Sequence, residues 1–192
     1  MTDEFEGMMQ LREVAASLDG AGVLWAIFAG TAASVYGAGR PVTDLDILVP
    51  AGEGERLKAL FPGAKVTREQ DLLHVALPGV DLLAGLGAID LDGEMASRVT
   101  RHKMGGIQVP VIPREDNILL KAMMGRGAEE GKHDWEDVAA MMASAPSLDW
   151  AYLRWRASKL NETAKVMVIL QKLESLWRQL RGEIEEGSGE QG

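Results

Sequence analysis

The architecture of this chain is predicted most directly by residues 28–49, which read FAGTAASVYGAGRPVTDLDILV. A wholly apolar run at residues 23–29 leads into this segment and is typical of a buried strand. The chain then turns into a short helix over residues 30–36 that ends at Gly37. A second strand is predicted over residues 44–49. The order strand, small-residue turn, helix and strand predicts a mixed α/β unit.

Two carboxylates lie in the second strand, within Asp44-Leu45-Asp46-Ile47. Because alternate residues of a strand share a face, Asp44 and Asp46 are expected to point to one side while the apolar residues point into the core. The strand repeat holds the two carboxylates about 7 Å apart, where they repel each other unless a cation lies between them. Mg²⁺ commonly takes one or two carboxylates together with substrate phosphates. The pair therefore predicts a site for Mg²⁺ or Mn²⁺.

A third carboxylate, Asp81, lies in an apolar, strand-like run over residues 80–84. Burying a lone carboxylate among apolar side chains is costly unless it is paired or bound to a metal. If this strand lies beside residues 44–49, Asp81 completes a three-carboxylate site with Asp44 and Asp46. Such a site can hold two metal ions about 3.5–4 Å apart, one on a triphosphate and one beside an attacking hydroxyl.

A phosphate site is predicted upstream, where Gly30 and Thr31 follow the first strand at the start of the short helix. A small-residue turn at a helix N-terminus offers backbone N–H groups and the positive end of the helix dipole to a phosphate. Arg40 precedes the carboxylates and is expected to hold this turn or to contact phosphate. Each feature occurs by chance in many proteins, so the prediction depends on their order along the chain.

This order of motifs resembles the DNA polymerase beta-like nucleotidyltransferase superfamily, and most of all its small prokaryotic members related to abortive-infection toxins and minimal nucleotidyltransferases. Their signature is a Gly-Gly or Gly-Ser turn, then Asp-x-Asp, then an aspartate on a later strand. The resemblance implies that Asp44, Asp46 and Asp81 are metal ligands and catalytic residues. It also implies that Gly30 and Thr31 line a pocket for the triphosphate.

The chain departs from the superfamily pattern at Ala29, which stands where the first glycine is usual. A methyl group there is expected to crowd a phosphate or to alter the turn. We therefore expect alanine at this position to change the affinity for nucleotide.

A second match lies in the segments ILLKAMMGR and KHDWEDV, between residues 118 and 138. They resemble the superfamily's helical segment Lys…Arg…Lys-x-Asp-x-x-Asp. The resemblance implies that Lys121 approaches the nucleotide phosphates and that Asp134 and Asp137 orient basic groups or cap a helix. Two plainer alternatives stay open, namely Lys121 and Arg126 as solvated charges on a helix face and Asp134 as a helix N-cap.

The fold class predicted for the whole chain is α+β, with a small mixed sheet and flanking helices followed by a C-terminal helical bundle. We expect a nucleotidyltransferase-like core over residues 1–113, a helical region over 114–186 and a disordered tail over 187–192. The remaining strands are predicted at residues 72–77, 80–84, 98–103 and 107–112, the last two as a hairpin. The remaining helices are predicted at residues 4–18, 53–60, 114–124, 134–143, 149–158 and 162–184.

The last predicted helix carries an apolar stripe. Met167, Ile169 and Leu176 make this stripe wider than a strict coiled-coil seam, which favours burial within the chain. A homodimer contact through the same helix is the alternative. The stripe follows alternating steps of four and three residues and consists of Val166, Leu170, Leu173, Trp177, Leu180 and Ile184.

The composition is that of an ordinary globular protein, with 46% hydrophobic and 26% charged residues. Cysteine is absent, which excludes disulfides and cysteine-ligated metal centres. Residues 1–97 hold 6 Lys/Arg and 15 Asp/Glu, a net charge of −9, whereas residues 98–126 hold 6 and 2, a net charge of +4. A pI near 4.9 argues against passive coating of nucleic acid, while the basic segment suits phosphate.

Three further features complete the sequence-based expectations. We expect a cytoplasmic protein with no membrane partner, because no apolar run is long enough to span a bilayer and the acidic start lacks the basic region of a signal peptide. The three histidines are scattered and show no metal-ligand spacing. Arg154, Arg156 and Lys159 form a basic cluster, which is either a surface for an acceptor or a solvated face.

The main functional prediction is a metal-dependent nucleotidyltransferase that moves an NMP from an NTP to a hydroxyl acceptor and releases pyrophosphate. The acceptor is predicted to be RNA such as tRNA, a protein side chain or a small molecule such as an aminoglycoside. A non-catalytic nucleotide- or partner-binding module of the same fold, for example a toxin–antitoxin component, is the alternative. A chance Asp-x-Asp on an unrelated scaffold is the third hypothesis.

Overall fold

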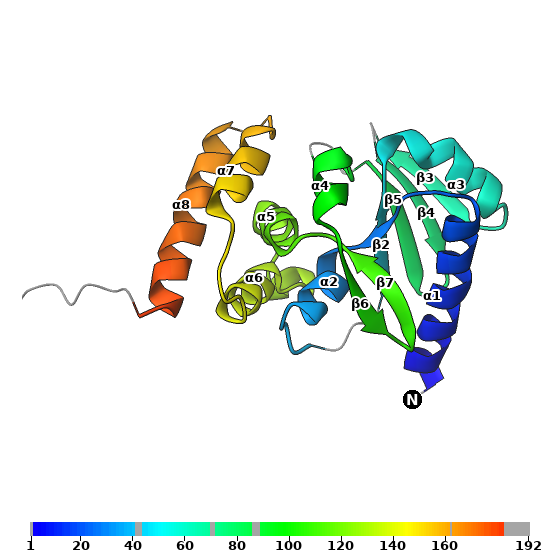
Figure 1. Cartoon of the computed structure of the whole chain (residues 1–192), viewed down its shortest axis with the longest axis horizontal. Coiled ribbons are helices and arrows are strands. Elements are labelled where there is room, and N and C mark those ends of the chain that lie inside the picture. Colours follow the sequence, from blue (N-terminus) through cyan, green and yellow to red (C-terminus); the bar gives the residue numbers. More distant parts are fainter. Residues whose placement is uncertain (1, 41–43, 70–71, 86–88, 162, 183–192) are drawn as a thin grey trace, which may run out of the picture.

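The computed structural model describes residues 2–40, 44–69, 72–85, 89–161 and 163–182. Its centre is a seven-stranded mixed sheet in the order β3-β4-β5-β2-β1-β7-β6 (Figure 1). The strands are β1 Ala26–Ile27, β2 Leu45–Val49, β3 Lys65–Glu69, β4 Leu72–Leu77, β5 Val80–Ala84, β6 Thr100–Met104 and β7 Ile107–Val111.

Helices cover both sides of this sheet. The N-terminal ones are α1 Thr2–Gly20, α2 Ala29–Val35, the 3-10 turn η1 Ala51–Glu53, α3 Gly54–Leu60 and α4 Gly93–Arg98. The C-terminal ones are α5 Arg114–Met124, the 3-10 turn η2 Ala128–Glu130, α6 Asp134–Ala143, α7 Trp150–Ser158 and α8 Thr163–Leu180. α1 and α3 lie on one side, while α2 and the C-terminal helices lie on the other (Figure 1). The α+β class and the C-terminal helical bundle are therefore confirmed.

Strand β2 joins the two halves of the sheet. It runs parallel to β5 and antiparallel to β1, which in turn runs parallel to β7. The register of the β2–β5 pair sets Asp46 opposite Asp81. The prediction that the Asp81 strand lies beside residues 44–49 is therefore confirmed, and the two carboxylates start from adjacent backbone positions.

The two faces of β2 and β5 differ in chemistry as the alternating pattern predicts. One face packs under α1 and α3, where a Cβ on Gly54 would meet the side chain of Leu73 at 2.9 Å, so this close approach favours glycine. Asp46 and Asp81 occupy the alternate positions and belong to the opposite face. The buried residues of the first face include Leu45, Ile47, Leu73, Val80 and Leu82.

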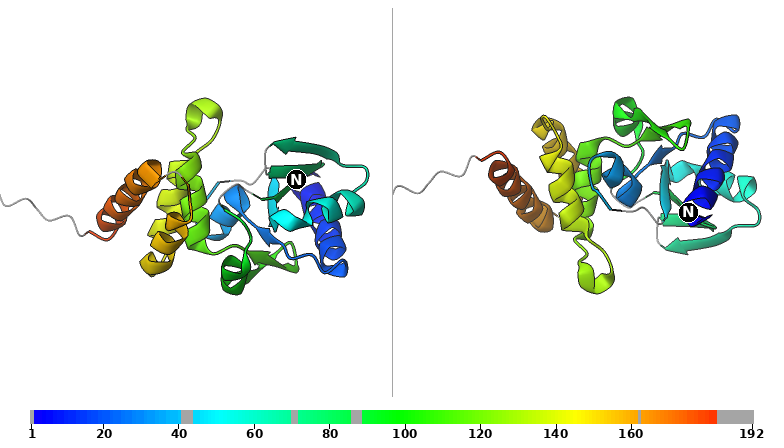
Figure 2. Two further views of the ribbon diagram at one scale, coloured as in Figure 1. Left: turned by 90° about the horizontal axis from the view of Figure 1, so that it is seen from above. Right: turned by 90° about the horizontal axis from the view of Figure 1, so that it is seen from below.

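The C-terminal helices pack on one another at the end of the molecule away from α1 (Figure 2). Val166, Ile169 and Leu173 of α8 are buried in the common core, which confirms packing of this stripe within the chain. Met167 is 52% exposed, so the wider stripe was wrong at that position. The homodimer alternative stays a prediction, and Ile184 lies outside the described residues.

The predicted boundary near residue 113 separates two regions that share one hydrophobic core. The backbone N–H of Ile112 donates to Ile27 at 3.0 Å, and the Asn117 amide donates to the carbonyl of Ala29 at 3.0 Å. α5 and α6 both pack against α2. The division into two domains stays a prediction, but this contact between α2 and the C-terminal helices is what forms the site below.

Three sequence-based expectations need correction or fall outside the structure. The strand expected at residues 98–103 begins at Thr100, because Arg98 ends helix α4. Strand β3 was not predicted, because all five of its residues are exposed and lack an apolar pattern. The tail at residues 187–192 lies outside the described residues. In the part of the chain that the structure describes, no helix combines the length and apolar character needed to cross a membrane.

Candidate active site

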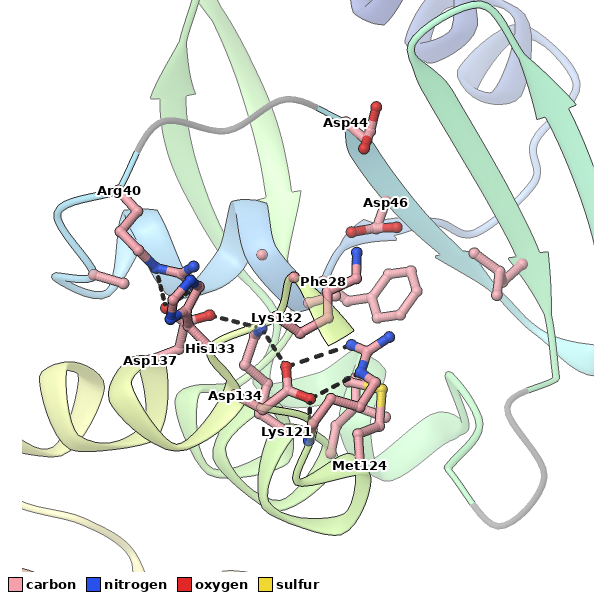
Figure 3. A pocket seen from close by; sticks show the side chains of 17 residues that line it. Phe28, Arg40, Asp44, Asp46, Lys121, Met124, Lys132, His133, Asp134 and Asp137 are labelled. Carbon is pink, nitrogen blue, oxygen red and sulfur yellow. Dashed lines mark hydrogen bonds and ion pairs between the residues drawn. The ribbon is translucent and has the colours of Figure 1, made fainter. Parts of the chain in front are cut away.

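A cavity of about 290 Å³ lies between the carboxylate strand and the C-terminal helices (Figure 3). Its walls come from β2, the start of α2, the end of α5, the loop after α5 and the first turn of α6. The ionisable residues that line it are Arg40, Asp44, Asp46, Lys121, Arg126, Lys132, His133, Asp134 and Asp137. Four carboxylates and four Lys or Arg cations therefore share one small volume.

Asp44 and Asp46 form the acidic wall of the cavity (Figure 3). Asp44 is exposed just before β2, and Asp46 is partly buried on the strand. Burial, with the charges of Asp81 and Asp44, raises the pKa of Asp46 from 3.8 to about 6, against the opposing effect of Lys121 and Lys132. A carboxylate in this situation favours either a proton or a bound cation.

Asp81 is held differently from the other two carboxylates. Its Oδ1 lies 2.5 Å from Nε2 of His74 on the neighbouring strand β4, and Asp81 is not part of the cavity lining. Within the described residues, no three His, Asp or Glu side chains are gathered closely enough to hold a metal ion. The role of Asp81 as a metal ligand stays a prediction, and His74 is a neighbour that sequence reasoning missed.

The donor set of Asp44 and Asp46 fits one divalent cation. Both carboxylates line the cavity, and Mg²⁺ or Mn²⁺ commonly binds through one or two carboxylates and fills its remaining positions with phosphate and water oxygens. A second ion would need Asp81, whose oxygen is already bound to His74. A second metal ion stays a prediction.

The turn after β1 gives Gly30 and Thr31 different roles. Gly30 lines the cavity, and a Cβ built on it meets no atom within 4 Å. Thr31 is 1% exposed and donates its hydroxyl to the backbone carbonyl of Asp44 at 3.1 Å. Thr31 therefore fixes the start of β2, and contact between Thr31 and phosphate stays a prediction.

Ala29 has a left-handed backbone with φ of 52°, and no other non-glycine residue of the described chain has positive φ. This conformation costs an L-residue about 1–2 kcal/mol relative to the right-handed region, whereas glycine adopts it freely. The backbone geometry at this point therefore favours glycine over alanine. Crowding of a phosphate and an altered turn both stay predictions for Ala29, and the structure adds a local backbone strain.

Lys121 is buried at the back of the cavity, with 4% exposure. Its ammonium nitrogen lies 2.9 Å from Asp134 Oδ1 and 2.7 Å from Asp137 Oδ2, both on the first two turns of α6. The alternative of a solvated lysine is therefore wrong. Direct contact of Lys121 with a nucleotide stays a prediction.

Asp134 and Asp137 organise the other cations as well. Arg126 donates Nε to Asp134 at 2.9 Å, and Arg40 donates Nε to Asp137 at 3.1 Å. The N-cap alternative for Asp134 is wrong, because α6 begins at Asp134 and its side chain binds Lys121 and Arg126. The hypothesis that these two aspartates orient basic groups matches the contacts.

Two cavity residues, Lys132 and His133, received no role from the sequence. They end the loop that connects α5 to α6, and Lys132 is exposed with its ammonium group pointing toward Asp46 (Figure 3). Their position directly before Asp134 in the matched segment could have indicated that they belong to the site. Phe28, Leu83, Leu120 and Met124 supply an apolar wall that the sequence motifs also did not reveal.

The members of the basic cluster at α7 lie in different environments. Arg156 is 2% exposed, pairs with Asp116 at 2.9 Å and donates to Asp92 at 2.6 Å, so neither the acceptor surface nor the solvated face describes it. Arg154 is exposed and binds Glu174. Arg156 joins α7 to α5 and α4, and its role is structural.

Comparisons with known proteins show which solved structures share this fold. No family model and no curated protein matches the sequence. Among solved structures, an antigenic nucleotidyltransferase-like protein from Paracoccidioides brasiliensis aligns with a TM-score of 0.55 at 16% identity, covering 92% of this chain and 91% of that one. The antibiotic-resistance factor ANT(2'')-Ia aligns with a TM-score of 0.50 at 18% identity, covering 94% and 97%. The chain therefore has the fold of nucleotidyltransferase-like proteins, as the motif order predicted.

Proposed function

We propose that this protein is a metal-dependent nucleotidyltransferase that moves an NMP from an NTP to a hydroxyl acceptor and releases pyrophosphate. One observation carries the proposal. The cavity sets the Asp44–Asp46 wall across from a group of cations, and a metal-bound triphosphate is the common metabolite class that complements both. The shared fold is consistent with this reading without establishing activity.

The residues of the cavity would act by positioning and charge neutralisation. Asp44 and Asp46 would hold Mg²⁺ or Mn²⁺, which when bound supplies charge neutralisation on the phosphate oxygens. Gly30 leaves room for a phosphate to approach the backbone. Lys121 and Arg40 would supply positive charge from positions fixed by Asp134 and Asp137.

The acceptor would approach beside Asp46, over the face of the sheet that carries Asp81 and His74. Its hydroxyl oxygen forms a bond to the α-phosphorus, the bond from that phosphorus to pyrophosphate breaks, and the hydroxyl proton would pass to Asp81 or to solvent. Asp81 would accept a hydrogen bond from this hydroxyl and lower its pKa. RNA, a protein side chain and a small molecule such as an aminoglycoside remain the acceptor classes to test.

The experiment uses NTPs labelled at the α-phosphate, with Mg²⁺ or Mn²⁺. RNA, protein and small-molecule fractions of a cell extract are offered as acceptors, and label transfer is scored for wild type and Asp44→Asn. We expect transfer by the wild type in one fraction and none by the variant. Equal transfer by Asp44→Asn would defeat the assignment.

A non-catalytic module that binds nucleotide or a partner protein is the second candidate. The pairing of Asp81 with His74 favours it, because the third carboxylate is then not gathered with the other two. This candidate predicts metal-dependent nucleotide binding without transfer, or a stable co-purifying partner such as the other component of a toxin–antitoxin pair.

A further inference from the structure

We infer that Lys132, rather than Lys121, makes the direct contact with the triphosphate, and that without a ligand the charge of Lys132 partly offsets that of Asp46 across the cavity. This inference rests on the proposed function, because it assumes a nucleotide in the cavity. It assigns the phosphate contact to an exposed loop side chain instead of the lysine that the motif resemblance favours.

Lys121 is poorly placed to meet a ligand. Its side chain is 6% exposed, and its ammonium group already binds the carboxylates of Asp134 and Asp137. A lysine ammonium has three hydrogens; one is donated to Asp134 Oδ1, and the charge of the group is also paired with Asp137 Oδ2 at 2.7 Å. Reaching a phosphate would require Lys121 to leave both partners, which would remove one cation from each of two buried carboxylates and leave them only Arg126 and Arg40.

Arg40 and Arg126 are also paired with these aspartates, each with only one of them. Arg40 is tied to Asp137, and Arg126 is tied to Asp134 through its side chain and its backbone N–H. Their remaining donors can still face a ligand. Each of them, however, is already paired with one of the two aspartates of α6, which also pair with Lys121.

Lys132 differs from these three cations. It is exposed and lines the cavity, and among the described residues it has no carboxylate within ion-pair distance. Figure 3 shows its ammonium group on the Asp46 side of the cavity, and its charge is among those that act on Asp46. A cation bound at Asp44 and Asp46 would repel Lys132 from that position and leave the phosphate oxygens as its best partners.

The loop that carries Lys132 is built to hold this position. Gly125 and Gly131 have left-handed backbones with φ of 59° and 66°, which turn the chain at each end of the loop. The N–H of Lys132 donates to the carbonyl of Gly127 at 3.0 Å, and the N–H of Asp134 donates to the carbonyl of Arg126 at 3.2 Å. These bonds fix the backbone of Lys132 opposite the acidic wall, and its side chain is exposed.

The test measures binding, so it needs no acceptor. Tripolyphosphate is titrated by calorimetry into wild type, Lys132→Met, Lys132→Arg and the control Lys103→Met, with Mg²⁺ and again with EDTA. Lys103 is an exposed lysine of β6 away from the cavity lining. Lys132→Met should bind about ten- to a hundredfold more weakly, the loss expected for one charged hydrogen bond, while Lys132→Arg and Lys103→Met stay close to wild type.

A second titration separates a phosphate contact from a structural role. Mn²⁺ alone should bind Lys132→Met at least as tightly as wild type, because the variant lacks a cation that competes for Asp46. If Lys132→Met binds tripolyphosphate as tightly as wild type, the inference is overturned and the proposed function stands. The same holds if the variant loses affinity for tripolyphosphate and Mn²⁺ equally and also has a lower Tm. A wild type that binds neither tripolyphosphate nor any NTP would overturn the proposed function as well.

Lys121→Met completes the comparison. This variant should lower Tm, because it removes the buried cation that Asp134 and Asp137 share and leaves each of them a single cationic partner. An unchanged Tm with the full loss of tripolyphosphate binding would assign the phosphate contact to Lys121 and overturn the inference.

Discussion

The substitution Asp46→Asn should make the ligand-free protein more stable at neutral pH. Asp46 is partly buried beside Asp81 and Asp44, and the pKa of Asp46 is raised from 3.8 to about 6. A carboxylate whose pKa is higher in the folded than in the unfolded state binds protons more strongly when folded. Its ionised form therefore destabilises the fold above that pKa, and asparagine removes the charge while keeping the shape.

The size of the effect follows from the pKa shift. Each pKa unit corresponds to about 1.4 kcal/mol, so a rise from 3.8 to about 6 corresponds to an upper bound of about 3 kcal/mol at pH 7. Because Asp46 borders an open cavity, solvent reduces this figure, and we expect an increase of about 1–3 kcal/mol in the free energy of unfolding. For a chain of this size, that raises Tm by about 3–9 °C.

The assay is urea unfolding in EDTA at pH 7.5 and at pH values down to 4. The contribution of Asp46 to the wild-type free energy of unfolding should rise as the pH falls from about 7 to 4, because Asp46 becomes protonated in the folded state. The free energies of unfolding of wild type and variant should therefore converge near pH 4. Glu13→Gln, which neutralises an exposed carboxylate of α1, is the matched control and should change little. A variant that is no more stable than wild type at pH 7.5 would refute the reasoning.

Three further substitutions test other parts of the account. Ala29→Gly should raise the free energy of unfolding by about 0.5–1 kcal/mol in urea unfolding, because glycine relieves the left-handed strain and loses part of that gain to its greater backbone entropy. Gly30→Ala should leave Tm unchanged, since a Cβ there meets no atom within 4 Å, yet should weaken nucleotide binding measured by calorimetry; equal affinity would show that phosphate stays away from Gly30. Arg156→Met should cost about 3–5 kcal/mol in the same unfolding assay by stranding buried Asp116, and adding Asp116→Leu should recover much of that loss; a cost below about 1 kcal/mol would contradict the ion-pair account.

The sequence predicted best where chemistry and periodicity agreed. The apolar alternation around Asp46 and Asp81 placed both residues on strands, and the order of motifs was enough to predict the fold. Strand β3 was missed because an edge strand with both faces exposed has no hydrophobic pattern to reveal it. Its pairing with β4 is a tertiary feature that local composition does not encode.

The sequence identified many of the residues of the site, but few of the contacts that they make with one another. Lys121 was identified, but its burial between two aspartates depends on how α6 packs on α5. The pairing of Asp81 with His74 depends on the register of β4 against β5. Contacts of this kind are set by strand register and helix packing, and a motif contains neither.

The most direct test of the central claim is thermal unfolding of the protein with each of the four NTPs, with and without Mg²⁺, in wild type and Asp46→Asn. At about 100 times its dissociation constant, a ligand adds about 2.7 kcal/mol, which should raise the wild-type Tm by about 5–10 °C. We expect a Mg²⁺-dependent rise for at least one NTP in wild type, and no such rise in Asp46→Asn relative to the variant's own higher baseline. No rise with any NTP, or the same rise in both proteins, would contradict the claim that this cavity binds a metal-bound nucleotide.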